Sequence, residues 1–178
     1  MSKASVRGAA KTLAPSVDTV VKSASWSALP DAEAIAARAI EAAASLARVK
    51  LLEGAELSLL LTDDAEMRGI NKQWRGKDAA TNVLSFPAVE PGKLGSAPFL
   101  GDIAVAYETL AREARDEGKS PADHFAHLVV HGFLHLLGHD HETDEEAGVM
   151  EALEVDILAT LGIANPYLDP PGDGRLAS

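Results

Sequence analysis

The chain has 178 residues, of which 47% are hydrophobic and 24% are charged, and its formal net charge is -11. This length and composition are typical of one soluble globular domain with a core of its own. The absence of cysteine excludes disulfides and thiolate metal ligands, so imidazole and carboxylate are the strong ligands that remain. It is also compatible with the cytoplasm, where we expect the protein. No apolar stretch reaches the roughly 20 residues that a membrane span requires.

Strands and helices are expected to follow one another along the chain. Short apolar runs bounded by turn residues predict strands at residues 17–21, 56–61, 82–86 and 102–106. Capping signals and helix-forming stretches predict helices at residues 31–47, 64–74, 107–117, 120–137 and 144–161. Residues 88–99 are rich in proline and glycine and are expected to form a loop. This order predicts an α+β fold, with a small mixed sheet of about four strands packed with about five helices.

One domain is expected at residues 17–167, because neither a repeat nor a linker interrupts this stretch. Residues 1–16 carry basic side chains but lack the apolar stretch of a secretory signal, so we expect a disordered extension. Residues 168–178, which hold prolines and glycines, are expected to form a flexible tail.

Three histidines stand in the run HGFLHLLGHDH: His131, His135 and His141. Residues four apart lie one above the other on a helix, so His131 and His135 can offer two imidazoles to one metal ion. Gly138 can end the helix, because glycine accepts a left-handed conformation, and the chain can then bring in His141 as a third ligand. Three protein ligands leave one position for water, as in a catalytic zinc site. One Zn2+ ion is therefore the expected cofactor, although imidazole also suits nickel, copper or iron.

The same spacing occurs in the metzincin peptidase pattern HExxHxxGxxH. The glutamate of that pattern is a general base, and its position is taken here by Gly132, which has no side chain to accept a proton. We therefore expect a metal-dependent hydrolase whose chemistry differs from the usual peptidase route.

Arg75, in the turn Trp74-Arg75-Gly76-Lys77, is a candidate catalytic residue. A metal ion can polarise a phosphoryl oxygen, and a cation placed nearby would stabilise the charge that develops on a phosphodiester. Arginine suits this role because its planar guanidinium can make two parallel hydrogen bonds to phosphate. The alternative is a solvent-facing helix end, where the helix dipole favours a cation.

Further candidates lie in the histidine run or just before it. His127 precedes His131 by four residues, and it is expected either to support a ligand through a hydrogen bond or to be a partly buried structural residue. His139 could compete with His141, which we prefer because it keeps the spacing of the pattern. Asp140 is expected to orient a ligand or to cap the turn.

Three expectations concern residues outside that run. Ser85 and Asp102 are expected near the floor of a cleft, each with a structural role favoured over a catalytic one. His124, near a helix start, is expected at the surface. Residues 140–156 hold eight acidic residues and neither Lys nor Arg, so this block is expected to form a solvated outer face.

These motifs resemble the YbeY family of bacterial endoribonucleases, also called rRNA maturation factors. The segment HLVVHGFLHLLGHDH at residues 127–141 resembles the signature of that family. Three further segments agree with it: NKQWRGKDAATNVLSFP at 71–87, LGDIAV at 100–105 and MEALEVDILATLGIANPY at 150–167. The likeness covers about residues 17–167.

The resemblance implies an α+β fold with helices around a cleft, a zinc ion held by His131, His135 and His141, and an essential Arg75. It also implies cleavage of single-stranded RNA, in 3′-end maturation of small-subunit ribosomal RNA and in ribosome quality control. Ribosome-associated proteins are then expected as partners, with no DNA and no membrane. Two features depart from the family: His139 stands where a tyrosine is frequent, and residues before about 17 are additional.

Two alternatives remain open. The first is a metallohydrolase of another substrate class, such as a peptidase, which a glutamate supplied by another segment would revive. The second is a non-catalytic assembly factor with a structural metal, which a fourth protein ligand such as His139 would favour.

Overall fold

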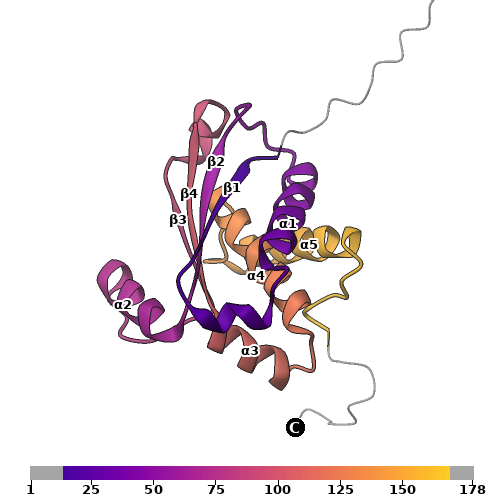
Figure 1. Ribbon diagram of the computed structural model, residues 1–178. Helices are drawn as coiled ribbons and strands as arrows, with labels where there is room; N and C mark the ends of the chain where they lie inside the picture. Colours follow the sequence, from indigo (N-terminus) through magenta and orange to yellow (C-terminus); the bar gives the residue numbers. More distant parts are fainter. Residues whose placement is uncertain (1–13, 169–178) are drawn as a thin grey trace, which may run out of the picture.

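A four-stranded mixed sheet forms the centre of the protein, as the computed structural model of residues 14–168 shows (Figure 1). Its strands run in the spatial order β1-β2-β4-β3, and their bounds are Ser16–Val21 (β1), Glu56–Thr62 (β2), Phe99–Ala106 (β4) and Val83–Pro87 (β3). The first three strands pair in parallel, whereas β3 pairs antiparallel with β4 and forms one edge. The predicted α+β class is confirmed.

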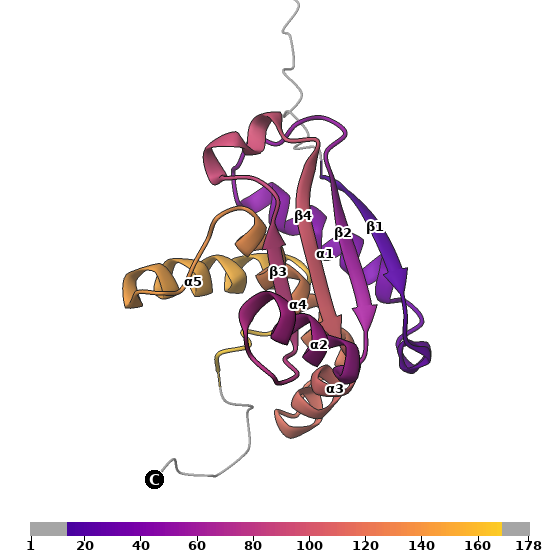
Figure 2. The ribbon, with the colours of Figure 1, turned by 90° about the vertical axis from the view of Figure 1, so that its left-hand side faces the viewer.

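The helices cover both faces of this sheet. Within the described residues there are five α-helices: α1 (Ala32–Leu46), α2 (Asp64–Arg75), α3 (Tyr107–Asp116), α4 (Pro121–Leu136) and α5 (Asp144–Thr160). Helices α1, α4 and α5 lie on one face and α2 lies on the other, as the two views of the ribbon show (Figures 1 and 2). In the part of the chain described here, no helix combines the length and the apolar character that a membrane crossing demands.

Alternate residues of the strands feed two separate cores, because successive side chains of a strand point to opposite faces. Ile103 and Val105 of β4 belong to the large core under α1, α4 and α5, whereas Ala104 and Ala106 belong to a small core under α2. The same alternation places Ser85 of β3 towards α4.

Helix α4 is the most enclosed helix among the described residues. Ser120 caps its start by accepting a hydrogen bond from the backbone N–H of Asp123, and the sheet, α1, α3 and α5 pack around it. From residue 124 to the end of α4, the side chains that keep partial exposure are His127, His131 and His135, spaced four apart. The solvent-accessible side of this part of the helix therefore consists of three imidazole side chains.

Four details differ from the expectations. Strand β4 begins at Phe99 rather than at residue 102, and the expected loop contains a 3-10 helix at Pro91–Ser96. A second 3-10 helix, Ala24–Ala28, was not expected; it buries Trp26, whose Nε1–H donates to the carbonyl of Thr62 over 2.8 Å. Of the predicted extension and tail, residues 1–13 and 169–178 lie outside the described residues, while Ser16 already belongs to β1.

Gly101 is required where β4 passes β3. Its φ is +141°, and a Cβ built there would lie 2.3 Å from the carbonyl oxygen of Phe86, a backbone atom that cannot move away cheaply. We expect Gly101→Ala to lower the free energy of unfolding by about 1–3 kcal/mol in chemical denaturation. Gly148→Ala is the matched control, because that exposed position of α5 has open space around it. It should leave stability unchanged or raise it by up to about 1 kcal/mol, and an equal loss in both variants would contradict this explanation.

Candidate metal centre and the adjoining hollow

Three imidazoles converge at the C-terminal end of α4. One ring nitrogen from each of His131, His135 and His141 lies within 4.8 Å of the others, and these three residues form a group that could hold a metal ion. The ring centroids of His131 and His135 are 4.6 Å apart, as expected for residues one turn apart on a helix. His141 comes from the turn after the helix, and its ring centroid lies 5.0 Å from that of His135.

The turn that brings His141 back depends on Gly138. This glycine has a φ of +96°, and a Cβ there would lie 2.5 Å from Cγ of Pro91. The backbone N–H of His139 then bonds to the carbonyl of Leu134, which closes the end of the helix. Asp140 caps the turn, since its carboxylate accepts from the N–H of His141 over 2.8 Å.

The Nδ1 atoms of the two helical rings each face a hydrogen-bond acceptor. Nδ1 of His131 lies 2.6 Å from Oε1 of Glu154, and Nδ1 of His135 lies 2.9 Å from the carbonyl oxygen of His139. A backbone carbonyl only accepts, and a carboxylate at neutral pH only accepts, so both Nδ1 atoms must carry the proton. In the neutral form of the two rings, the Nε2 atoms then carry lone pairs.

These two lone pairs face each other, because the Nε2 atoms of His131 and His135 are 3.0 Å apart. In neutral rings, two lone pairs at that distance repel unless a proton or a metal ion lies between them. Nitrogens about 2.0–2.1 Å from one tetrahedral ion would be roughly 3.3 Å apart, close to what is present here. The donor set therefore fits a divalent metal ion.

His135 is prepared to act as a ligand at neutral pH. Burial, and next the unfavourable interaction with His131, lower the pKa of His135 to about 4. The ring is therefore neutral at pH 7, and its lone pair is not occupied by a proton.

Glu154 is the buried acid of this region, with 0% of its surface exposed. Its carboxylate accepts hydrogen bonds from His131, from His127 (2.8 Å) and from the Tyr167 hydroxyl. Burial alone would raise the pKa of Glu154, but these hydrogen bonds outweigh burial and lower the pKa to about 2. The carboxylate is therefore ionised next to the histidine group.

The sequence prediction missed Glu154, since it treated residues 140–156 as one solvated face. A signal was present nevertheless: Glu154 follows Met150 by four residues and precedes Ile157 and Leu158 by three and four. It thus lies on the apolar stripe of α5, whose other members are buried.

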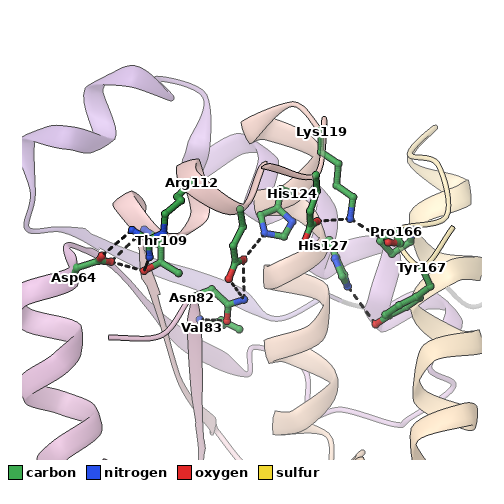
Figure 3. Close-up of polar contacts among 12 residues, drawn as sticks. Asp64, Asn82, Val83, Thr109, Arg112, Lys119, His124, His127, Pro166 and Tyr167 are labelled. Atoms are coloured by element: carbon green, nitrogen blue, oxygen red, sulfur yellow. Dashed lines mark hydrogen bonds and ion pairs between the residues drawn. The ribbon is translucent and has the colours of Figure 1, made fainter. Parts of the chain in front are cut away.

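The two neighbouring histidines differ in how they compare with the expectations: His127 is partly buried, as expected, whereas His124 is not at the surface. His127 bonds to Glu154 and lies beside Tyr167 (Figure 3). The expectation that His124 is at the surface is wrong: the residue is 4% exposed, and its Nε2 lies 2.7 Å from a carboxylate oxygen of Glu113 on α3. The packing of α3 against the first turns of α4 covers a position that would otherwise face solvent.

A hollow of about 660 Å³ adjoins the three histidines. Its walls come from the end of α2, from β3 and from the turn after α4, and they include Arg75, Lys77, Ser85, His131, His135, His139, Asp140 and His141. Of the other candidate site residues, four line this hollow: Arg75, Ser85, His139 and Asp140. His127 does not line it.

Arg75 reaches the hollow across the edge of the sheet. It is the last residue of α2, its Nη2 donates to the carbonyl of Ser85 over 3.1 Å, and its guanidinium lies 5.7 Å from the ring centre of Phe86. An edge strand has backbone carbonyls without a strand partner, and this bond uses one of them. The guanidinium is thereby held at the wall of the hollow that the histidines also line.

Ser85 and Asp102 have different surroundings. The Ser85 hydroxyl donates to the carbonyl of Gly132 over 2.9 Å and ties β3 to α4. Asp102 is exposed and lines a separate groove beside Trp74, so the expectation that it lies near the floor of the same cleft is wrong. The reason is the strand alternation, since Ile103 is the β4 residue that faces α4.

His139 contributes its backbone carbonyl to the histidine group. The residue lines the hollow, but among residues 14–168 the group of converging metal-ligand atoms holds His131, His135 and His141 alone.

Comparisons with known proteins agree with one another. The family model described as "Endoribonuclease YbeY" matches residues 21–162. The Endoribonuclease YbeY of Bradyrhizobium diazoefficiens is 54% identical over 163 residues, which are 89% of this chain and 88% of that protein. That of Azorhizobium caulinodans is 55% identical over 155 residues, which are 86% of this chain and 97% of that protein.

The bond between Ser85 and Gly132 gives a test of the structural role of the serine. We expect Ser85→Ala to lower the free energy of unfolding by about 1 kcal/mol, because a buried hydrogen bond between β3 and α4 is lost. Ser96→Ala, which removes an exposed hydroxyl, is the control and should change stability by less than about 0.5 kcal/mol. Chemical denaturation compares the two variants through their unfolding midpoints, provided that the dependence of the free energy of unfolding on denaturant is the same. Equal stability of the two variants would refute the structural role of the Ser85 hydroxyl.

Proposed function

The chain belongs to the YbeY family of endoribonucleases, and on this basis we propose that it is a zinc-dependent enzyme that cleaves single-stranded RNA. We further propose that it acts in the cytoplasm on the 3′ end of small-subunit ribosomal RNA and in ribosome quality control, with ribosome-associated proteins as partners. The observation that carries the proposal is the group of three imidazoles in the lining of a hollow that Arg75 also lines.

In this proposal His131, His135 and His141 hold the ion through nitrogens that lie within 4.8 Å of one another. Zinc suits a set of imidazoles without thiolates. When bound, such an ion polarises a phosphoryl oxygen and makes water a stronger nucleophile near neutral pH. Glu154 and the carbonyl of His139 keep the protons of His131 and His135 on Nδ1, so that Nε2 of each ring stays available.

Arg75 is proposed to bind the phosphate group of the RNA backbone. Its hydrogen bond to Ser85 and its position over Phe86 orient a group that carries five N–H donors, of which the bond to Ser85 uses one. A cation in this place stabilises charge on the phosphate as the bond breaks. A single strand suits the site better than a duplex, because its flexible backbone can bend into a hollow.

The peptidase alternative finds no support in the packing of Gly132. A Cβ at this position would lie 3.0 Å from Cγ2 of Ile103 and 3.0 Å from Oγ of Ser85. The residue faces the sheet rather than the hollow, so the place of the peptidase glutamate is filled by β3 and β4. A non-catalytic metal site is also disfavoured, since the His139 side chain is outside the converging group in the described residues.

Metal binding and RNA cleavage are both expected to depend on His131. We expect His131→Ala to lose both the bound ion and RNA cleavage, because two remaining imidazoles bind zinc weakly. His139→Ala is the control for metal content, and it should keep one ion per chain. Metal analysis of the purified variants and digestion of a single-stranded RNA measure both effects. Cleavage that survives chelation and verified metal removal would refute the proposal.

Arg75 is expected to affect RNA cleavage without affecting metal binding. We expect Arg75→Glu to keep one ion per chain but to lower kcat/KM for single-stranded RNA at least about a hundredfold, the scale of a lost electrostatic contact to the transition state. Lys72→Glu is the matched control, because it reverses a charge on the same helix at a residue outside the hollow. Equal losses in the two variants would show that Arg75 supplies only long-range charge.

A further inference from the structure

The buried carboxylate of Glu154 requires an explanation that stability does not offer. A charged group in a protein core costs several kcal/mol unless hydrogen bonds compensate, and an apolar residue at such a place is frequently as stable. The neighbours of Glu154 on α5, Met150, Ile157 and Leu158, are buried and apolar. The presence of an acid among them is therefore explained by the three groups that donate hydrogen bonds to it.

The two oxygens of this carboxylate have different partners. Oε2 accepts from Nε2 of His127 and from the hydroxyl of Tyr167, while Oε1 faces Nδ1 of His131. Since two donors bind one oxygen, they fix the plane of the carboxylate independently of His131, and this orients the other oxygen towards His131. A neutral imidazole has one proton, and the acceptor at Nδ1 determines that the proton stays there.

Tyr167 is itself held in place by contacts with its own segment, with Lys119 just before α4 and with His127 on α4. The Nζ of Lys119 donates to the carbonyl of Pro166 over 3.1 Å, and the backbone N–H of Tyr167 donates to the side chain of Asn165 over 2.9 Å. The ring centroids of Tyr167 and His127 are 5.6 Å apart, and Figure 3 shows the hydroxyl directed towards His127. The segment after α5 thus returns to the histidine edge of α4, at a position beyond the residues 21–162 that the family model matches.

We propose that Glu154 is a positioning residue for His131, and that His127 and Tyr167 orient its carboxylate. The relay from Tyr167 through Glu154 holds the His131 ring with Nε2 turned to the ion, and it thereby sets the affinity of the site for metal. This inference rests on the proposed role of His131 as a metal ligand.

The first test is the dissociation constant for Zn2+, measured in competition with a chromogenic chelator on the full chain. Glu154→Gln keeps the shape of the side chain but offers one oxygen to three donors, so we expect the constant to rise about 10–100-fold. Glu151→Gln is the matched control, since it removes one charge from an exposed position three residues earlier on α5. Its constant should equal that of the parent protein.

The second test needs no metal. Ring 15N chemical shifts of the metal-free protein report which nitrogen of His131 carries the proton. We expect the Nδ1–H form in the parent protein and in Glu151→Gln, and a mixture of both forms in Glu154→Gln. A residue that only filled space in the core would not change this ratio.

Tyr167→Phe keeps the test valid if Glu154→Gln does not fold. It removes one hydroxyl from a residue that is 45% exposed, and we expect a smaller rise in the dissociation constant together with partial loss of the Nδ1–H form. Parent-like values in folded Glu154→Gln, or in Tyr167→Phe where that is the folded variant, would overturn the inference. A parent protein that binds no zinc would instead overturn the proposed function, while its ring spectrum would still report on the relay.

Discussion

Two hydrogen bonds at Nδ1 determine what the histidine group can do. Because Glu154 and the carbonyl of His139 accept from His131 and His135, both rings present bare nitrogens to the same point, 3.0 Å apart. Without these acceptors each ring could place its proton on Nε2 or rotate, and convergence of the rings would not guarantee a ligand set. The metal chemistry that we propose depends on this arrangement more than on the number of histidines.

The fold supplies the arrangement by enclosing α4. The sheet and three helices cover the apolar sides of α4, so His127, His131 and His135 occupy its open edge. The contact with the sheet leaves no room for a side chain at Gly132, and the left-handed turn at Gly138 returns the chain towards the edge. Arg75, at the end of α2 on the other face of the sheet, reaches the same hollow at the edge strand β3. Ligands and cation thus come from two layers that meet at β3.

Much of this could be predicted from the sequence where the signal is local. Helix starts such as Asp63 and Ser120 carry their own caps, and the spacing of His131 and His135 fixes their common face. Contacts between distant segments were predicted less well. His124 is buried because α3 packs over it, Asp102 faces α2 because of the register of β4, and Glu154 lies inside because α5 turns its apolar stripe towards α4. Composition made residues 140–156 resemble a solvated face, and the periodicity of α5 was the better guide.

X-ray absorption at the zinc edge of the purified protein counts the atoms around the ion and so tests the proposed set of ligands. We expect one zinc per chain with three imidazole nitrogens at about 2.0–2.1 Å and one further oxygen from solvent. A spectrum with four protein ligands, or with fewer than three imidazoles, would contradict this expectation.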